Sequence, residues 1–320
     1  MYEHLIAMSL AVLIDFVIGD PPSLPHPVRW IGTGISRLER LFNRGASRKA
    51  KGIVMLLSVL TAVFLITALI IWCSYQIHLI FGIVIEGLII SSAIAQRNLK
   101  EHSLAVYEPL KSGNLAEARL KLSYIVGRDT NDLDEGEIVR GAVETVAENT
   151  SDGVTAPLFW GLIGGAPLAM VYRAINTCDS MVGYKNERFQ EFGWASAKMD
   201  DLVNWIPSRM TGALMLIGSK PGHGNTREAW QILLRDAKRH PSPNSGWGEA
   251  AVAALLGIQL GGVNYYKGII SIRAKMGEPK VPLKKEHILK ANTILTKTVM
   301  LFLLVLWIGG ILVELAITWS

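Results

Sequence analysis

The sequence has little charge and almost no cysteine. Only 18% of its 320 residues are Asp, Glu, Lys or Arg, whereas soluble domains carry about a quarter. The two cysteines, Cys73 and Cys178, supply neither a disulfide framework nor a zinc site. Basic runs interleaved with aromatic residues are also lacking, so the formal net charge of +5 does not indicate a nucleic-acid partner.

The missing charge is concentrated in long apolar segments. Residues 53–72 contain no charged residue, and about 20 apolar residues cross a bilayer. Residues 299–317 and 77–95 are similar, although the latter contain Glu86. Residues 5–19 lack a basic leader and a small-residue cleavage site, so we interpret them as a retained helix and not as a signal peptide. The pattern predicts a multi-pass protein of the cell membrane, with the lipid bilayer as a partner.

Three further apolar segments are short or interrupted by Gly and Pro: residues 154–172, 206–218 and 250–263. Each fits a tilted span, a re-entrant hairpin or a helix buried in the protein. Broken helices at membrane depth require surrounding protein or a polar cavity. We expect an all-α, polytopic fold with roughly 4–6 spanning or re-entrant helices. No strand-like segment is long enough to suggest a sheet, and residues 1–320 are expected to form one membrane-embedded domain.

Lys and Arg are concentrated in the loops that flank the strongest apolar segments, at residues 29–51 and 267–297. The positive-inside rule makes both loops cytoplasmic and leaves both termini outside. Residues 96–153 then form a cytoplasmic insertion. Its apolar residues recur at helical spacing, and Asn114 is expected to cap the second helix of this insertion.

The first polar motif is DFVIGDPPSLPHPVRWIG, residues 15–32. Its prolines oppose a regular helix and favour an ordered turn. His26 and Arg29 follow that turn, and an arginine there is able to clamp a phosphate or carboxylate with two hydrogen bonds. The alternative is a stiff interfacial turn with one anchoring arginine.

The second motif, RGAVETVAENTSDG, begins at Arg140 and contains an acidic repeat. Glu144, Glu148 and Asp152 recur every four residues, so they share one face if the helix continues that far. Like charges at this spacing destabilise a helix, and a bound Mg²⁺ would explain their tolerance. The alternative is a solvated acidic face.

The third and fourth motifs, YRAINTCDSMVGYKNERF and KMDDLVNW, lie within residues 172–205. Asp200 and Asn204 are one helical turn apart and face the same side, whereas Asp201 projects about 100° away. This arrangement resembles the Mg²⁺–diphosphate sites of terpenoid enzymes. A solvated loop between helices is the alternative.

The fifth motif is RDAKRHPSPNSGWGEAAVAALLGIQLGG, residues 235–262. Asn244 or Ser245 is expected to cap the apolar helix, whose first N–H groups favour an anion. His240 is either a base, a phosphate donor or a structural residue. The glycines of KPGHGN lack P-loop spacing, so ATP would have to bind without that motif.

These five motifs, in this order from about residue 9 to about residue 270, resemble the membrane-bound adenosylcobinamide-phosphate synthase family of cobalamin biosynthesis. The resemblance implies an ATP-dependent carbon–nitrogen ligase. It would join the propionate carboxylate of adenosylcobyric acid, a corrinoid, to (R)-1-aminopropan-2-ol O-phosphate or ethanolamine phosphate. Mg²⁺ and ATP are expected as cofactor and co-substrate, with the active site toward the cytoplasm. Residues 173–250 would form its loops and broken helices.

Under that resemblance, charge and placement suggest the site residues. The expected metal ligands are Glu148, Asp152, Asp200 and Asp201. The expected catalytic residues are Asp200, Asp201, Glu148, Asp179 and His240, with the base left open between Asp179 and His240. The expected phosphate- and substrate-binding residues are His26, Arg29, Arg140, Asn149, Arg173, Asn176, Lys185, Arg188, Asn204, Arg209, Asn244 and Ser245.

Two other functions are consistent with parts of this pattern. An intramembrane prenyltransferase would bind a Mg–diphosphate, but it needs a second Asp-rich motif, and only Asp179 stands in the first loop. A corrinoid transporter or binding subunit would predict inverted repeats, and none is present. A homo-oligomer, or a complex with later cobalamin-assembly enzymes, is left open.

Overall fold

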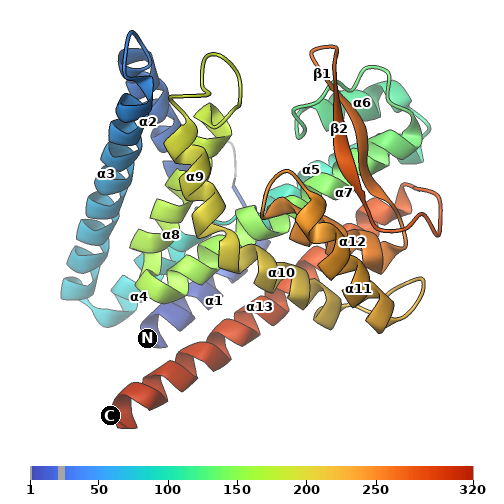
Figure 1. Cartoon of the computed structure of the whole chain (residues 1–320). Helices are drawn as coiled ribbons and strands as arrows, with labels where there is room; N and C mark the ends of the chain where they lie inside the picture. The colour runs from blue at the N-terminus through green and yellow to red at the C-terminus, as the bar shows by residue number, and fades with distance from the viewer. Residues whose placement is uncertain (1, 21–25, 320) are drawn as a thin grey trace. The chain divides into compact units, whose positions relative to one another are not determined.

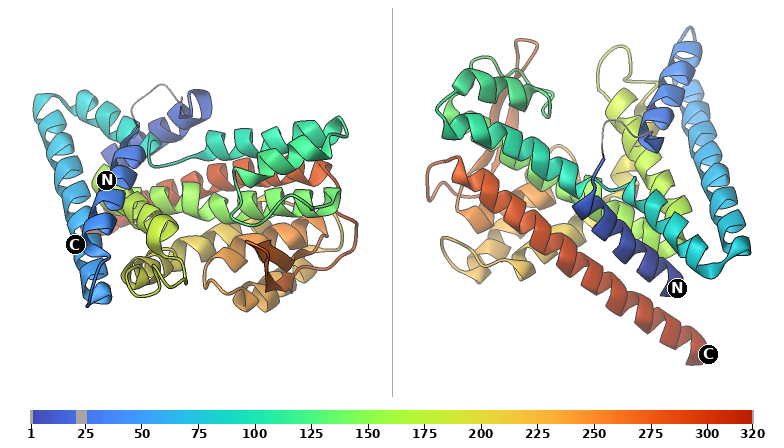
Figure 2. Two further views of the ribbon diagram at one scale, coloured as in Figure 1. Left: turned by 90° about the horizontal axis from the view of Figure 1, so that it is seen from above. Right: turned by 180° about the vertical axis from the view of Figure 1, so that it is seen from behind.

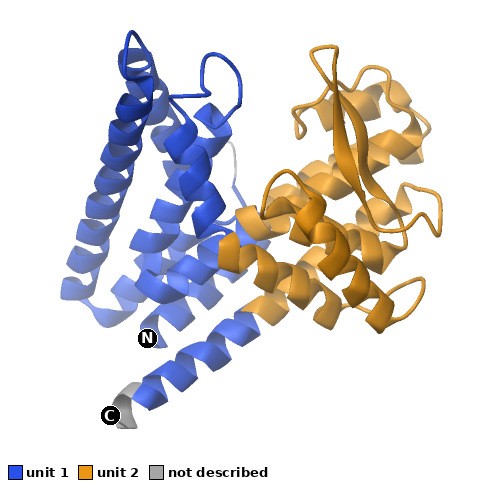
Figure 3. Ribbon diagram, in the orientation of Figure 1, with its two compact units in different colours: residues 1–95, 153–204, 303–320 blue, residues 96–152, 205–302 orange. Residues whose placement is uncertain are grey.

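The computed structural model describes residues 2–20 and 26–319, and the side chains of the last helix as far as residue 316. The fold is all-α in class, with 74% of the chain helical. Its chain contacts divide it into two compact units (Figure 3). Unit 1 comprises residues 1–95, 153–204 and 303–320, and unit 2 comprises residues 96–152 and 205–302.

Unit 1 is a set of packed helices. The helix α1 packs on α4, and α3 packs on α8. The helices α2 and α3, coloured in shades of blue, form an antiparallel pair (Figures 1 and 2). Its helices are α1 (Tyr2–Val17), α2 (Pro27–Phe42), α3 (Arg48–Ile77), α4 (Leu79–Ser91), α8 (Ala156–Val182) and α9 (Trp194–Val203). The last helix, α13 (Glu286–Trp319), begins in unit 2 and ends in unit 1.

Four helical stretches are long and apolar enough to cross a membrane: Arg48–Ile77, Leu79–Lys111, Glu135–Val182 and Glu286–Ala316. The spans predicted at 53–72 and 299–317 are therefore confirmed as long helices, and the fold is that of a polytopic membrane protein. Most of the predicted span at 77–95 lies within the stretch Leu79–Lys111, in which the 13-residue helix α4 is followed by a turn that leads into α5. The helix α1 has 16 residues, which is slightly below the usual spanning length.

The helix α8 is broken in its first half, as the Gly- and Pro-rich sequence of 154–172 predicts. Gly164 and Gly165 leave helical geometry, and Gly165 has a φ of 62°, which glycine adopts without a Cβ penalty. The backbone N–H of Ala166, just after the break, donates to Glu86 Oε1 over 3.1 Å. Glu86 is fully buried and also accepts hydrogen bonds from Tyr75 at 2.6 Å and from the ring of His4 at 2.7 Å. The carboxylate thus satisfies backbone that the break exposes.

Unit 2 combines shorter helices with a β-hairpin. The insertion expected at 96–153 is helical, and Asn114 caps α6 as predicted, because its side chain accepts the Glu117 N–H at 3.1 Å. The elements are α5 (Gln96–Lys111), α6 (Leu115–Ser123), α7 (Glu135–Thr150), α10 (Trp205–Gly218), α11 (Thr226–Asp236), η2 (Ala237–Arg239), α12 (Ser245–Leu256), β1 (Leu260–Tyr266) and β2 (Ile269–Met276). A π-helical turn, Ser151–Thr155, joins α7 to α8.

The hairpin corrects the expectation that the chain lacks paired strands. The strand β1 pairs antiparallel with β2, with an irregularity between Leu260 and Gly262. The turn at Lys267 and Gly268 has positive φ at both residues, and the carboxylate of Asp129 accepts both of their N–H groups at 3.0 and 2.8 Å. Residues 250–263 therefore are not one apolar segment, because α12 ends at Leu256 and a strand follows.

Candidate functional site

The Asp-rich motif of unit 1 lies where α9 packs on α8. Asp200 and Asn204 occupy the same side of α9, as their spacing predicts. Asn176 Nδ2 donates to Asp200 Oδ1 at 3.3 Å, and the Tyr172 hydroxyl donates to Asn204 Oδ1 at 2.7 Å. Because Asn204 and Tyr172 are buried, packing and hydrogen bonds hold this part of the motif in place, and it is not a solvated loop. We refer to Asp200, Asn204, Asn176 and Tyr172 as the Asp200 wall.

The negative charge that acts most strongly on Asp200 is that of Asp179 on α8. Burial, together with the negative charge of Asp179, raises the pKa of Asp200 to about 7. Asp179 in turn lies against Gly183, where an added Cβ would overlap its Oδ1. Asp201 projects elsewhere, as predicted, and lies 3.5 Å from Lys198 Nζ at a half-exposed position.

This pair fits a hard cation. Two carboxylates that repel each other supply the hard oxygen donors that Mg²⁺ prefers, and a cation would remove the repulsion. Among the described residues no three His, Cys, Asp or Glu side chains converge to hold a metal. Additional ligands would have to be water or substrate phosphate, which is the usual situation for Mg²⁺. The other expected ligands, Glu148 and Asp152, belong to unit 2.

The basic residues expected in unit 1 occupy different places. His26 caps α2 by accepting the Val28 N–H at 3.3 Å. Arg188 forms a forked pair with Glu39 at 3.0 and 3.1 Å. Arg173 points its guanidinium at Asn176 Oδ1 over 3.5 Å, beside the Asp200 wall. The remaining two, Arg29 on α2 and Lys185 after α8, are exposed.

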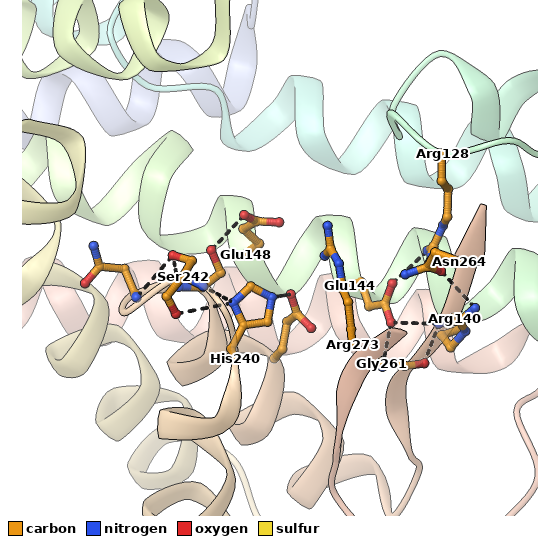
Figure 4. A network of polar contacts seen from close by, with 12 residues as sticks. Arg128, Arg140, Glu144, Glu148, His240, Ser242, Gly261, Asn264 and Arg273 are labelled. Carbon is orange, nitrogen blue, oxygen red and sulfur yellow. Dashed lines mark hydrogen bonds and ion pairs between the residues drawn. The ribbon is translucent and has the colours of Figure 1, made fainter. Parts of the chain in front are cut away.

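Unit 2 contains a polar network between α7, α12 and the hairpin (Figure 4). Glu144 accepts hydrogen bonds from Arg128 Nη2 at 2.7 Å and from the Gly261 N–H at 2.8 Å. Arg140 donates to the carbonyls of Gly261 and Val263 and to Asn264 Oδ1. The charge on this part of the acidic repeat is therefore balanced by buried arginines, which also attach the hairpin to α7.

The acidic repeat does not continue as one α-helical face. The helix α7 ends at Thr150 and Asp152 lies in the π-helical turn, whose wider turns change the angular spacing. Glu148 Oε1 accepts the Ser245 hydroxyl at 2.8 Å (Figure 4). Asn149 donates to the Thr145 carbonyl at 2.9 Å. Glu144 and Glu148 thus bind protein groups on different elements.

The cap of α12 differs from the expected one. The Asn244 side chain makes no capping bond, and the Ser242 hydroxyl accepts the N–H groups of both Asn244 and Ser245 at 3.3 Å. Asn244 Oδ1 instead accepts from Ser208 at 3.3 Å and Arg209 at 3.4 Å. Arg209 also lies over the rings of Trp205 and Trp247, at 4.3 and 5.0 Å.

His240 has a partner that sequence reasoning missed. Its Nε2 lies 3.6 Å from Glu249 Oε1, and the two side chains are 5% and 1% exposed. Burial, together with the charges of Glu144 and Glu148, raises the pKa of Glu249 well above its usual value. Burial also lowers the pKa of His240. Both groups are therefore held near neutrality and are able to share or move one proton.

A small cavity of about 130 Å³ opens beside this network. A cavity of this size accommodates a few water molecules or one small charged group, and not a whole corrinoid. Arg128, Arg273, Glu148 and Asn149 line it. Arg128 and Arg273 have no local sequence pattern that would have revealed them, whereas the single Glu249 in an apolar helix was a visible indication.

These observations define a helical, polytopic membrane protein with buried ionisable groups in both of its units. A model of the CobD/Cbib protein family, described as "CobD/Cbib protein", matches residues 8–295. The chain belongs to this family. It is 54% identical over 308 residues to "Cobalamin biosynthesis protein CobD" of Halalkalibacterium halodurans, covering 96% of this chain and 97% of the relative.

Other curated relatives show the same pattern. The chain is 50% identical to "Cobalamin biosynthesis protein CobD" of Geobacter metallireducens, over 85% of this chain and 86% of the relative. It is 44% identical to the protein of the same name from Clostridium perfringens, over 91% and 93%. No solved structure matches the chain.

Proposed function

We propose that the chain is an adenosylcobinamide-phosphate synthase of cobalamin biosynthesis. It would form an amide between the propionate carboxylate of adenosylcobyric acid and (R)-1-aminopropan-2-ol O-phosphate or ethanolamine phosphate. Family membership and relatives named for cobalamin biosynthesis support this proposal. The structural observation that supports it best is the Asp200–Asp179 pair beside Asn176, a donor set suited to a Mg²⁺-bound phosphate.

The chemistry requires activation of the acid, since a carboxylate is a poor electrophile. A carboxylate oxygen attacks the γ-phosphorus of ATP, giving an acyl phosphate and ADP. The amine then attacks the acyl carbon, its C–N bond forms as the C–O bond to phosphate breaks, and inorganic phosphate and one proton leave. This class of reaction is an ATP-dependent carbon–nitrogen ligation, and it makes charge stabilisation at the phosphates the main requirement.

The chain's own residues have separable roles in this proposal. Asp200 and Asp179 of unit 1 are the oxygen donors that this proposal assigns to Mg²⁺. Of the other expected ligands, Asp201 lies against Lys198, and Glu148 and Asp152 belong to unit 2. When bound, Mg²⁺ neutralises phosphate charge and acts as a Lewis acid. Arg173 lies beside Asn176 at 3.5 Å, so its guanidinium is suited to a phosphate oxygen next to the Asp200 wall.

The proton released by the amine needs an acceptor. His240 and Glu249 form a buried, weakly charged pair 3.6 Å apart, which suits a group that takes up and passes on one proton. Asp179 is the alternative acceptor, and it is less suited when its oxygens bind a cation. ATP and the corrinoid are cytosolic, so we propose a location in the cytoplasmic membrane with the site open to the cytoplasm.

The test is an assay of protein purified in detergent, with adenosylcobyric acid, the amino-alcohol phosphate and Mg–ATP. The proposal predicts ADP release that depends on both organic substrates and an amide product of the corresponding mass. Asp200→Asn should lower turnover by at least about 100-fold, as expected for loss of a metal ligand. ATP turnover that is independent of the amine, or corrinoid binding without an amide product, would favour the transporter or binding-subunit class instead.

A further inference from the structure

The tip of the α2–α3 pair carries a basic pocket that the proposed reaction does not use. Its volume is about 420 Å³, and four arginines and two glutamates contribute to its lining, all within unit 1. The arginines are Arg40, Arg44, Arg48 and Arg188. We refer to it as the arginine pocket.

One carboxylate of the arginine pocket is already neutralised. Arg188 forms two hydrogen bonds to Glu39, and Asn43 Nδ2 donates to Glu39 Oε1 at 2.9 Å. Burial alone would raise the pKa of Glu39, but these hydrogen bonds outweigh it and hold the pKa below the usual value. Glu39 therefore remains ionised, and it anchors the guanidinium of Arg188 at the edge of the pocket.

Arg44 and Arg48 have no such compensation. In the part of the chain that the structure describes, Arg44 and Arg48 form no ion pair with a carboxylate, and Arg48 Nη1 only reaches the Glu187 carbonyl at 3.5 Å. With four arginines against two glutamates, the lining carries excess positive charge. Forked guanidinium donors in a concave site match the oxygens of a phosphate.

The distance along α3 between the arginine pocket and the exposed apolar residues indicates which kind of phosphate compound binds there. Arg48 begins α3, and Val54 and Leu57 on the same helix expose 52% and 54% of their surface. At about 1.5 Å per residue, Val54 is about 9 Å from Arg48 along the axis. The polar layer of a bilayer is about 5–8 Å thick on each side, so apolar side chains suited to lipid tails begin where the arginines end. Lys49 also lies over the ring of Trp194 at 3.8 Å, and tryptophan and lysine are typical of the membrane interface.

We propose that the arginine pocket binds the phosphate headgroup of an anionic phospholipid and so fixes the α2–α3 pair at the membrane surface. A basic pocket beside apolar helices is the usual architecture for headgroup recognition. A soluble phosphate has the same donor requirements, but it gains nothing from the adjacent lipid-facing surface. The lipid is therefore expected to bind more tightly than inorganic phosphate or pyrophosphate.

The test uses the full chain, delipidated in detergent, with phosphatidylglycerol, phosphatidylcholine, inorganic phosphate and pyrophosphate as separate probes. Native mass spectrometry counts bound lipid, and thermal unfolding measures stabilisation. Phosphatidylglycerol should bind wild type and raise its unfolding midpoint, and R44Q/R48Q should weaken binding about tenfold or more. The matched control K100Q/K111Q, which removes two exposed positive charges of α5 in unit 2, should bind as wild type does.

Three outcomes overturn the proposal. The first is equal phosphatidylglycerol binding by wild type and R44Q/R48Q. The second is equal binding of phosphatidylcholine and phosphatidylglycerol by wild type. The third is tighter binding of inorganic phosphate or pyrophosphate, lost in R44Q/R48Q, which would make the pocket a site for a soluble anion. R44K/R48K, which keeps the charge and loses the forked donors, serves as a second variant if the glutamine variant fails to fold, and intermediate affinity is then expected.

Discussion

Asn176 on α8 donates a hydrogen bond to Asp200 on α9 across 3.3 Å, and this contact holds the Asp200 carboxylate in the field of Asp179. The wall that results is built from two motifs separated by an exposed segment of the chain. Without a cation, the negative charges of Asp200 and Asp179 repel each other. This repulsion can be measured through its effect on the free energy of unfolding.

Asp200→Asn should stabilise the metal-free protein at alkaline pH. A carboxyl whose pKa is raised by folding, here to about 7, binds more protons in the folded state than in the unfolded state between about pH 4 and pH 7. The wild-type free energy of unfolding therefore falls as the pH rises through this window, by about 1–3 kcal/mol, and stays low above it. Asn has no such titration. The check is the difference between variant and wild-type unfolding midpoints in EDTA at pH 5 and pH 8, which should grow with pH.

Gly183→Ala should displace the Asp179 carboxylate, because the new Cβ overlaps Asp179 Oδ1 and the backbone carbonyl of the same residue. We expect a loss of about 1–3 kcal/mol in stability and a larger loss in turnover. Gly34→Ala is the matched control, since a Cβ there has no neighbour within 4 Å and a helical alanine is favoured by about 0.5–1 kcal/mol. Comparable stability of the two variants would show that Gly183 does not constrain Asp179.

Arg140→Lys should loosen the hairpin. Lysine cannot reproduce the fork that binds Gly261, Val263 and Asn264, so buried acceptors lose their donors at a cost of about 2–4 kcal/mol. Trypsin cleavage after the exposed Lys267 should become faster. Arg97→Lys, at an exposed i,i+4 pair with Glu101, should change stability by less than about 0.5 kcal/mol and leave the cleavage rate unaltered. An unchanged rate in Arg140→Lys would contradict this account of the hairpin.

Glu249→Gln should fold well, because its raised pKa keeps the wild-type carboxyl largely protonated and the amide has nearly the same shape. The free energy of unfolding of the wild type should fall as the pH rises above the ordinary pKa of glutamate. The glutamine variant does not titrate and should not show this fall. Glu249→Ala should instead leave a cavity and destabilise the protein by about 1–3 kcal/mol. If Glu249 passes on a proton with His240, the glutamine variant will also lose turnover and its pH profile will change. A profile identical to that of the wild type would remove Glu249 from the reaction.

Local patterns in the sequence predicted local geometry well. The spacing of Asp200 and Asn204 and the cap at Asn114 each depend on residues within a turn or two, and each was confirmed. For residues 154–172 the Gly and Pro content left three alternatives, and the structure shows a broken helix. The long apolar helices followed from composition alone. These features needed only helical periodicity and backbone chemistry.

Contacts between distant segments could not be predicted in the same way. Nothing in the spacing of Asp200 identifies Asp179 as its electrostatic partner, because that pairing depends on how α9 packs on α8. The Arg128–Glu144 pair likewise depends on how the segment before α7 folds back against that helix, and the hairpin itself was missed because Gly261 and Gly262 obscure a short strand. The cap of α12 was assigned to Asn244 or Ser245 from residue preference, whereas the Ser242 hydroxyl accepts the N–H groups of both of these residues from the preceding turn.

The amide-forming function is tested most directly by isotope transfer. Adenosylcobyric acid with ¹⁸O in its carboxylate is incubated with the protein, Mg–ATP and the amino-alcohol phosphate, and both products are analysed by mass spectrometry. The proposal predicts the amide product together with one ¹⁸O in the released inorganic phosphate, since the C–O bond of an acyl phosphate breaks. Unlabelled phosphate, or ADP release without the amide, would contradict it.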